Sequence, residues 1–291
     1  MKNIAVLLTV FNRCDITLAG LRSLYKAISY LSNDYHFDIY MTDDGCKDGT
    51  KAAVSTVFPS VTIVEGDGNL YWSGGMRAAW SEAVKHNDYD YYLWFNDDAM
   101  LFEDALVSIF KASESLSQPC IVTGAFCDNQ GVVSYGGKSR NWKLIAPIKN
   151  KYQPVHWMNG NLVLISKNVY KTIGMIDTVF IHGTGDYDYG RRAAKAGFDV
   201  VLTDVFVGQT NRHDDPNYVP YKQNMNIIQR FRVLYSPRFS PIPSFIFSYR
   251  HIGLFDAIRV FLQSNLNAVF PFLKKYIYKI GKYKRSIKER R

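Results

Sequence analysis

The sequence is poor in cysteine, and the cysteines it has form no motif. Cys14, Cys46, Cys120 and Cys127 are scattered over 291 residues without a Cys-x-x-Cys pair. Disulfide frameworks and structural zinc sites depend on closely spaced cysteines, so this pattern argues against both. We therefore expect a protein of the reducing cytoplasm.

Several other sequence signals are missing as well. The chain contains neither the Gly-x-Gly-x-x-Gly fingerprint of dinucleotide-binding proteins nor the Walker lysine loop of nucleoside triphosphatases. The first apolar run, residues 4–10, is short and lacks a small-residue cleavage site, so we expect no secretion signal. Apolar residues near the C-terminus are interrupted by polar ones too often for a membrane span.

Apolar and aromatic residues, in contrast, are plentiful. Hydrophobic residues make up 47% of the chain and aromatic residues 15%, which is enough for a large core and excludes global disorder. The net charge of +9 is unevenly distributed, because residues 274–291 hold nine Lys and Arg and one Glu. The rest of the chain is nearly neutral, so any electrostatic partner is expected at the tail.

Residues 91–98 are the stretch around which the chain is organised. Tyr91–Phe95 is a continuous apolar run, typical of a strand buried on both faces. Asp97 and Asp98 follow at its carboxyl end, where ligands of open α/β sheets collect. Adjacent carboxylates repel unless a cation or a shared proton offsets their charge, so the pair indicates a divalent cation held for a phosphate-bearing ligand. The alternative is a polar turn that caps the next helix.

Strands and helices alternate through the first 118 residues. A second acidic pair, Asp43 and Asp44, ends the second strand, and we expect Asp15 and Ser73 to cap the first and third helices. The alternation predicts a parallel sheet with helices on both faces. The expected strands are 4–10, 37–42, 61–64 and 91–95, and the expected helices are 16–31, a short one after residue 50, 73–86 and 103–116.

The following residues are less regular. Short antiparallel strands are expected among residues 132–145, and a polar loop at 182–189 leads into a helix that Gly197 ends. The two halves together predict an α/β fold with a mixed sheet flanked by helices. Further strands are expected at 121–124, 161–166 and 198–202.

A C-terminal extension follows the predicted sheet domain. Three prolines within residues 236–244 mark a boundary between 1–235 and 236–291. Residues 254–273 repeat apolar side chains every three or four positions, which predicts an amphipathic helix kinked or ended by Pro271. That helix either packs on the main domain or lies in a membrane interface beside the basic tail, and a merely solvated tail is the alternative.

The acidic motifs, in their order along the chain, resemble glycosyltransferase family 2. Residues 9–13, 43–50 and 96–98 are similar to the opening half of that family, and residues 173–197 are similar to its acceptor half. Within that family, the sequence resembles rhamnosyltransferase-like enzymes that build bacterial surface polysaccharides. The resemblance implies a GT-A (Rossmann-like) fold, with a nucleotide-binding half over 1–118 and an acceptor half over 119–235. It also implies a nucleotide-sugar donor, Mn²⁺ or Mg²⁺, and inversion at the anomeric carbon.

The resemblance further implies roles for single residues on the donor side. Asp97 would lie at the donor, and Asp98 would coordinate the metal that bridges the diphosphate. Asp43 or Asp44 would bond the nucleoside. The residues that would line the base pocket or otherwise contact the donor are Thr9, Phe11, Arg13, Asn69 and Arg77.

Asp186 falls at the position where the family keeps its general base. Gly185 replaces the glutamate that usually precedes this base, so Asp188 is an alternative. Either aspartate could instead cap the helix that follows. Further candidates are Trp157 and Asn159 near the donor sugar or acceptor, and His213, or else His182, as an additional metal ligand.

These features lead to one leading hypothesis and two alternatives. We expect an inverting, metal-dependent glycosyltransferase that moves a sugar from a UDP-, dTDP- or GDP-linked donor to a lipid-linked or polysaccharide acceptor. It would lie on the inner face of the cell membrane, held to anionic lipid by its tail, with no nucleic-acid partner and with homodimer formation left open. A metal-dependent nucleotidyltransferase would need a basic triphosphate loop, where residues 9–13 offer only Arg13. A non-catalytic scaffold is supported only by Gly185.

Overall fold

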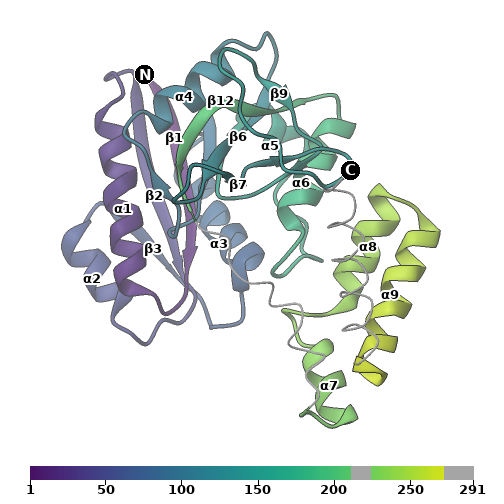
Figure 1. Cartoon of the computed structure of the whole chain (residues 1–291). Helices are drawn as coiled ribbons and strands as arrows, with labels where there is room; N and C mark the ends of the chain where they lie inside the picture. The colour runs from purple at the N-terminus through teal and green to yellow at the C-terminus, as the bar shows by residue number, and fades with distance from the viewer. Residues whose placement is uncertain (211–223, 272–291) are drawn as a thin grey trace. The chain divides into compact units, whose positions relative to one another are not determined.

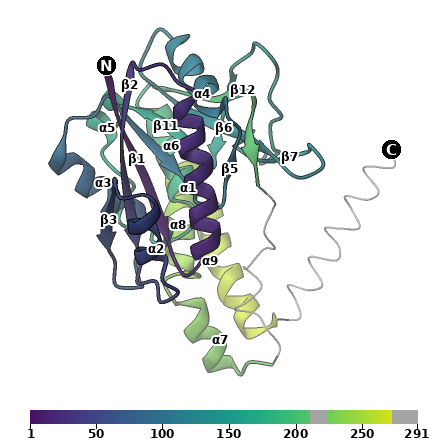
Figure 2. The same ribbon diagram turned by 90° about the vertical axis from the view of Figure 1, so that its left-hand side faces the viewer.

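The computed structural model describes residues 1–210 and 224–271, and the chain divides into two compact units, Met1–Arg212 and His213–Arg291. The first unit is a sheet with helices on both faces (Figures 1 and 2). Its helices are α1 (Cys14–Ser29), α2 (Thr50–Val57), α3 (Tyr71–His86), α4 (Ala105–Glu114), α5 (Lys167–Ile173) and α6 (Gly185–Lys195). Its strands are β1 (Lys2–Val10), β2 (Tyr35–Asp43), β3 (Val61–Glu65), β4 (Tyr91–Phe95), β5 (Met100–Leu101), β6 (Cys120–Cys127), β7 (Val133–Tyr135), β8 (Gly137–Lys138), β9 (Gln153–Pro154), β10 (Trp157–Met158), β11 (Leu162–Ser166) and β12 (Asp199–Gln209).

The sheet confirms the predicted mixed α/β fold. Its strand order is β3-β2-β1-β4-β11-β6-β12-β5, with β7 beside β6 and β9 beside β12. The strands β1 to β4 run parallel, as do β6 and β12, whereas β11 runs antiparallel to both of its neighbours, β4 and β6. A short second sheet pairs β8 with β10. A strand buried on both faces has the same apolar pattern in either direction, so the sequence did not reveal the reversed strand.

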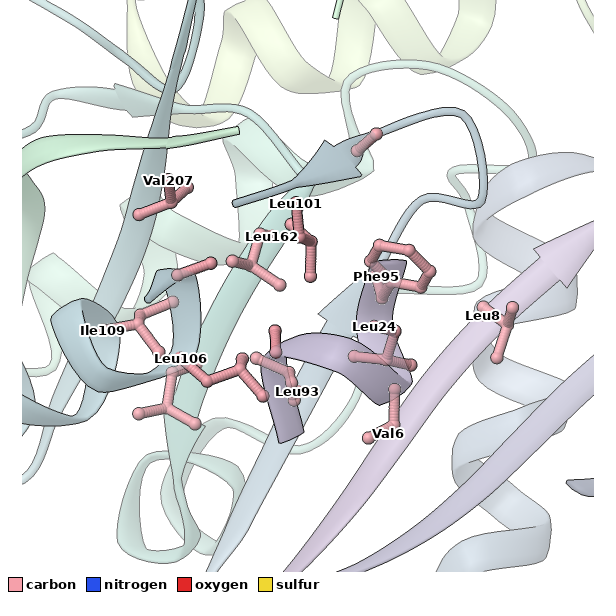
Figure 3. Close-up of a cluster of buried hydrophobic side chains, with 14 of the residues drawn as sticks. Val6, Leu8, Leu24, Leu93, Phe95, Leu101, Leu106, Ile109, Leu162 and Val207 are labelled. Carbon is pink, nitrogen blue, oxygen red and sulfur yellow. The ribbon is translucent and has the colours of Figure 1, made fainter. Parts of the chain in front are cut away.

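Alternating side chains on the central strands supply two hydrophobic layers. On β1, Val6 and Leu8 join the layer covered by α1 and α4, while Leu7 joins the layer covered by α3 and α6. Figure 3 shows part of the first layer, where Leu93 and Phe95 of β4 meet side chains from α1 and α4. Because both faces of β4 are covered, only its carboxyl end remains to present polar residues.

The helix α1 begins differently from the prediction. It starts at Cys14, and the backbone N–H of Cys14 donates to Asp48 Oδ2 at 2.8 Å. Asp15 lies in the first turn and makes no capping hydrogen bond, so the expectation that it caps this helix was wrong. The acceptor comes from the loop after β2, 34 residues away, which short-range pattern reading cannot detect.

The helix α3 shows the same kind of difference. It starts at Tyr71, whose backbone N–H donates to Asp44 Oδ2 at 2.9 Å. Ser73 lies inside the helix and donates instead to the carbonyl oxygen of His182 at 3.1 Å. The predicted Ser73 cap was therefore wrong, because a carboxylate from the end of β2 organises this helix start.

In the second unit, the described residues 224–271 form helices that pack on one another. They are α7 (Ile227–Leu234), α8 (Pro241–His251) and α9 (Leu254–Val269). The helix α9 ends just before Pro271, as predicted. The helix α8 was not predicted, because three nearby prolines indicate a boundary. Proline is tolerated in the first turn of a helix, where Pro241 lies. Within the described residues, no helix has the length and apolarity that crossing a membrane requires.

A glycine on α1 fixes how closely this helix approaches the end of β4. A Cβ atom on Gly20 would lie 2.1 Å from the backbone oxygen of Asp97, far inside van der Waals contact. We predict that Gly20→Ala lowers the free energy of unfolding by about 1–3 kcal/mol, since overpacking outweighs the better helix propensity of alanine. Urea unfolding followed by circular dichroism measures this.

The control is Gly183→Ala, because a Cβ atom there meets nothing within 4 Å and the residue has no positive φ. Its urea midpoint should match that of the unmodified chain. Equal midpoints for the Gly20 and Gly183 variants would show that the backbone contact does not constrain the helix.

Candidate active site

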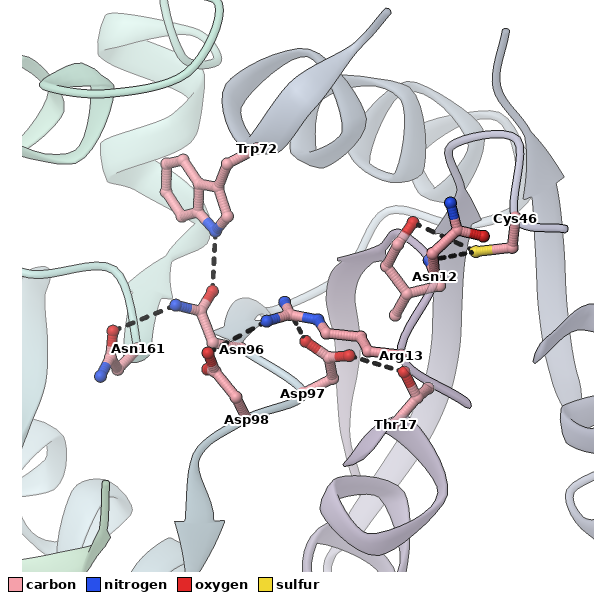
Figure 4. A network of polar contacts seen from close by, with 10 residues as sticks. Asn12, Arg13, Thr17, Cys46, Trp72, Asn96, Asp97, Asp98 and Asn161 are labelled. Atoms are coloured by element: carbon pink, nitrogen blue, oxygen red, sulfur yellow. Dashed lines mark hydrogen bonds and ion pairs between the residues drawn. The ribbon is translucent and has the colours of Figure 1, made fainter. Parts of the chain in front are cut away.

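The end of β4 carries a polar network that links distant parts of the chain (Figure 4). Asp97 is fully buried, and its Oδ2 accepts a hydrogen bond from Thr17 Oγ1 at 2.6 Å. The guanidinium of Arg13 forms ion pairs with Asp97 and, at 3.1 Å, with Asp98. Burial raises the pKa of Asp97 to about 6, while Arg13 and Thr17 favour its charged form. Asp97 therefore anchors the loop from inside.

Asp98 differs from its neighbour in exposure. Its side chain is 19% exposed, whereas the Asp97 side chain is at 0%. Magnesium and manganese take oxygen ligands, and Mg²⁺ typically uses one or two carboxylates together with substrate phosphates. Within residues 1–210 and 224–271, no three His, Cys, Asp or Glu side chains form a metal cage. Asp98 fits a metal shared with a phosphate ligand, with Arg13 beside it as a second positive charge.

Asp44 organises the loop between β3 and α3. Its carboxylate accepts backbone N–H groups from Gly68, Leu70 and Tyr71 at 2.9, 3.2 and 2.9 Å. Asp43, at the end of β2, accepts the N–H of Cys46 at 2.7 Å. Both aspartates are buried. The acidic pair therefore shapes the two loops that flank the carboxyl ends of β1 and β2.

The other predicted donor-side residues have distinct surroundings. Thr9 packs against Gly75, where a Cβ atom would lie 2.1 Å from Thr9 Oγ1. Phe11 is exposed in the loop after β1. Arg77 donates to the carbonyl oxygens of Asp177 and Phe180 at 3.1 and 2.7 Å, and its burial lowers its pKa. Asn69 is exposed and bonds to Asp67 within the loop 66–70, while His213 lies outside the described residues.

Two asparagines and a tryptophan join the nucleotide-side and acceptor-side parts of the chain. Trp72 Nε1 donates to Asn96 Oδ1 at 2.7 Å, and Asn96 Nδ2 donates to Asn161 Oδ1 at 3.0 Å. A Cβ atom on Gly160 would lie 2.5 Å from the Trp72 ring and 3.5 Å from Cβ of Asp186. Trp72 thus lies between the residue that precedes the acidic pair and the loop that contacts Asp186.

The two candidate bases differ in their environment. Asp186 is partly buried, and its carboxylate accepts the N–H of Gly160 at 3.1 Å and that of Tyr187 at 2.8 Å. Burial raises its pKa to about 6. Asp188 is fully buried and paired with Arg192 at 2.8 Å. The Arg192 guanidinium also donates to backbone oxygens at residues 173 and 175, so Asp188 holds internal structure together.

An aromatic cluster lies next to Asp186 on the acceptor side. Trp157 is buried and stacks on Trp142, with ring centroids 4.4 Å apart and planes 10° apart. The Tyr187 hydroxyl accepts hydrogen bonds from Lys138 Nζ at 2.6 Å and Asn159 Nδ2 at 3.2 Å. Asn159 Oδ1 is buried and has no hydrogen-bond partner among the described residues, so it is a candidate acceptor for a ligand hydroxyl.

Sequence reasoning missed part of this arrangement. Asn96 and Trp72 had a usable signal, since one precedes the acidic pair and the other belongs to the glycine-bearing loop. Thr17, Asn161 and Tyr187 had none, because their role depends on contacts made across 80, 65 and 28 residues of chain.

The fold described above is similar to those of several solved structures. A mannosyltransferase from Pyrobaculum calidifontis, solved with GDP-Man and Mn²⁺, is similar with a TM-score of 0.56 and 15% identity, covering 97% of this chain and 82% of that one. Residues 1–349 of S. aureus TarS are similar with a TM-score of 0.54 and 14% identity, covering 92% of this chain and 81% of that one. The same TarS fragment, solved with UDP-GlcNAc, has a TM-score of 0.52 and 10% identity, covering 94% of this chain and 73% of that one. At these identities the similarity shows a shared GT-A-like fold.

The sequence itself shows the family. No curated protein matches the chain. The sequence profile described as glycosyl transferase family 2 matches residues 5–174, which is more than half of the chain and includes the strand that leads to Asp97 and Asp98. The chain belongs to glycosyl transferase family 2 and is a glycosyltransferase that uses a nucleotide sugar.

Proposed function

We propose that this protein is an inverting, metal-dependent glycosyltransferase in which Asp98 holds the metal and Asp186 is the general base. The single observation that supports this most is the network from Asn96 through Trp72 to Gly160. It links the loop of Asp98 with the backbone N–H group that binds Asp186. The two chemical requirements of the reaction, at the leaving group and at the nucleophile, thus fall in one connected part of the fold.

On the leaving-group side, negative charge grows on the diphosphate as the sugar departs. A divalent cation bound with Asp98 would supply Lewis-acid stabilisation of this charge, worth on the order of several kcal/mol. Arg13 adds a fixed positive charge at the same place, since its guanidinium contacts both carboxylates of the pair. Asp97, being buried and paired, keeps this arginine oriented.

On the nucleophile side, the acceptor hydroxyl must lose its proton as it attacks the anomeric carbon. Asp186 accepts that proton, because its pKa of about 6 leaves it deprotonated near neutral pH while retaining basicity. Direct attack by the acceptor, opposite the departing diphosphate, inverts the anomeric centre. The buried ion pair of Asp188 with Arg192 favours Asp186 over Asp188 for this role.

The substrates are proposed from the structural neighbours and the sequence resemblance. The similar proteins were solved with GDP-Man and UDP-GlcNAc, which supports a nucleoside-diphosphate sugar as donor. The resemblance to rhamnosyltransferase-like enzymes supports a lipid-linked or polysaccharide acceptor in bacterial cell-surface glycan synthesis. Screening UDP-, GDP- and dTDP-sugars for thermal stabilisation with and without Mn²⁺ tests the donor class, since a ligand of the native state raises its stability.

We also propose a peripheral attachment to the inner face of the cell membrane. Apolar side chains on α8 and α9 are exposed, with Phe255 at 91% and Leu262 and Leu266 at 52% each. The sequence places nine basic residues immediately after this region, at 274–291. Apolar contact combined with several basic residues is the combination that holds peripheral proteins to anionic lipid.

The first test concerns the metal ligand. Asp98→Asn removes a charged oxygen ligand but keeps the shape of the side chain. We predict a loss of transferase kcat of at least about 100-fold, because stabilisation of the leaving diphosphate is lost, together with weaker Mn²⁺ binding by calorimetry. Asp15→Asn, on the exposed first turn of α1, is the matched control and should leave both unchanged. Normal Mn²⁺ affinity in the Asp98 variant would contradict the assignment.

The second test concerns the general base. Because burial raises the pKa of Asp186 to about 6, kcat/KM should fall about tenfold per pH unit below 6 and level off above it. Asp186→Asn should lower the plateau by about 10²–10⁴-fold and abolish this limb of the profile. Rate profiles from pH 5 to 8 measure both effects. A profile in the Asn variant that keeps the same inflection would assign the proton transfer elsewhere.

The third test concerns membrane attachment. Deleting residues 274–291 should move the protein from the pellet to the supernatant in sedimentation with phosphatidylserine vesicles, because each basic residue contributes about 1 kcal/mol near an anionic surface. Added salt should weaken binding of the full chain. Neutral phosphatidylcholine vesicles serve as the control, and unchanged sedimentation after the deletion would refute attachment through the tail.

A further inference from the structure

A separate cavity of about 450 Å³ lies on the acceptor side, and its lining includes none of the residues labelled in Figure 4. Its lining combines the loop after β8, the strand β9, the helix α6 and the start of β12. A volume of this size matches small-molecule sites, which typically measure about 300–1,000 Å³. The proposed transfer reaction uses none of its charged residues.

Positively charged and hydrogen-bond-donating groups gather in this lining. Arg140 and Arg191 both contribute, and Arg191 Nη1 donates to His156 Nδ1 at 3.3 Å. Since arginine only donates hydrogen bonds, this ring nitrogen must be the acceptor. Asp199 is the acidic residue among the described residues that line the cavity. Two arginines and one aspartate therefore give the lining a net positive charge.

Arg191 has donor capacity that the fold leaves unused. Its Nε is buried and has no hydrogen-bond partner among the described residues. Its guanidinium lies 5.9 Å from the centre of the Trp157 ring, which limits its movement. Burial and the nearby Arg140 both lower the pKa of Arg191. A buried unpaired donor and a like-charged neighbour each cost free energy, and an anionic ligand would relieve both costs.

We propose that this cavity binds the phosphate group of a glycosyl phosphate, with Arg140 and Arg191 as the phosphate ligands. Paired arginines suit phosphate because their planar N–H groups match its oxygens in bidentate geometry. Inorganic phosphate alone would contact the arginines but would leave the acidic and apolar residues of the lining without a partner. Asp199 can accept hydrogen bonds from sugar hydroxyls, and Val155 and Phe198 offer apolar surface for a sugar ring.

The position of the cavity connects it with the acceptor. Arg191 follows Tyr187 by four residues on α6, so the two side chains share one face of that helix. Tyr187 in turn receives the hydrogen bond of Asn159, whose neighbour Gly160 contacts Asp186. Resting on the proposed function, we infer that the bound phosphate belongs to the acceptor.

The experiment measures binding to the full-length protein by calorimetry at constant ionic strength. The probes are glucose 1-phosphate, its methyl diester, inorganic phosphate and glucose. Mn²⁺ and whichever of UDP, GDP or dTDP stabilises the protein most are present at saturation, so that the donor site is filled. The diester distinguishes a phosphate embedded in a polymer or lipid-linked acceptor from that of a free sugar phosphate.

The variants are Arg191→Gln and Arg140→Gln, with Arg22→Gln on the exposed surface of α1 as the matched control. We expect glucose 1-phosphate to bind, and each cavity variant to weaken it by roughly tenfold or more, since hydrogen bonds to charged groups are the stronger ones. The Arg22 variant should bind normally. Arg140 is exposed, so its variant keeps the test valid if the Arg191 variant is misfolded by circular dichroism.

Three results would overturn the inference. Absent binding of glucose 1-phosphate would remove the site, as would equal affinity in the Arg140 and Arg22 variants. Inorganic phosphate binding as tightly as glucose 1-phosphate would remove the sugar part of the proposal. Nucleotide and Mn²⁺ affinities, measured in the same variants, should not change. Failure of the donor reaction would instead appear in those affinities or in the Asp98 and Asp186 variants, so the two proposals fail separately.

Discussion

The ion pair between Arg13 and the buried carboxylate of Asp97 is the interaction on which the site depends. A fully buried carboxylate without a partner costs several kcal/mol, so the end of β4 is stable only with Arg13 and Thr17 in place. The two adjacent aspartates therefore have different environments. Asp97 is held inside, whereas the Asp98 side chain stays partly exposed. Gly20 lets α1 approach closely enough to make this arrangement.

Carboxylates at the ends of other strands act on the backbone. Asp44 collects three N–H groups and fixes both the loop 66–70 and the start of α3. Asp48 accepts the first N–H of α1. These acceptors satisfy donors that a helix start leaves unpaired, and each links segments more than twenty residues apart. Acidic residues that appear in sequence only as ligand candidates therefore also build the walls around the candidate site.

Polar contacts join the acceptor side to this frame near the candidate site, in addition to the pairing of β11 with β4. The bridge from Trp72 through Asn96 to Asn161 is one, and the hydrogen bond from Ser73 to the carbonyl oxygen of His182 is another. Arg77 adds a third by binding two backbone oxygens of the loop 177–180. A Cβ atom at position 160 would clash with the Trp72 ring. Because Gly160 has none, its backbone can pass between Trp72 and Asp186. Rigid placement of this kind is what a transfer between two bound substrates requires.

The sequence by itself determined the α/β class, most of the central strands, the position of the acidic pairs at strand ends, and the family. It could do so because apolar periodicity and the order of acidic motifs are local properties of the chain. It did not determine the reversed direction of β11, the caps of α1 and α3, or the helix α8. Nor did it show that Asp97 is buried and paired with Arg13, or that Asp188 is buried and paired with Arg192. Only the tertiary structure decided these, because each depends on a partner from a distant segment, and burial and pairing exist only once those segments meet.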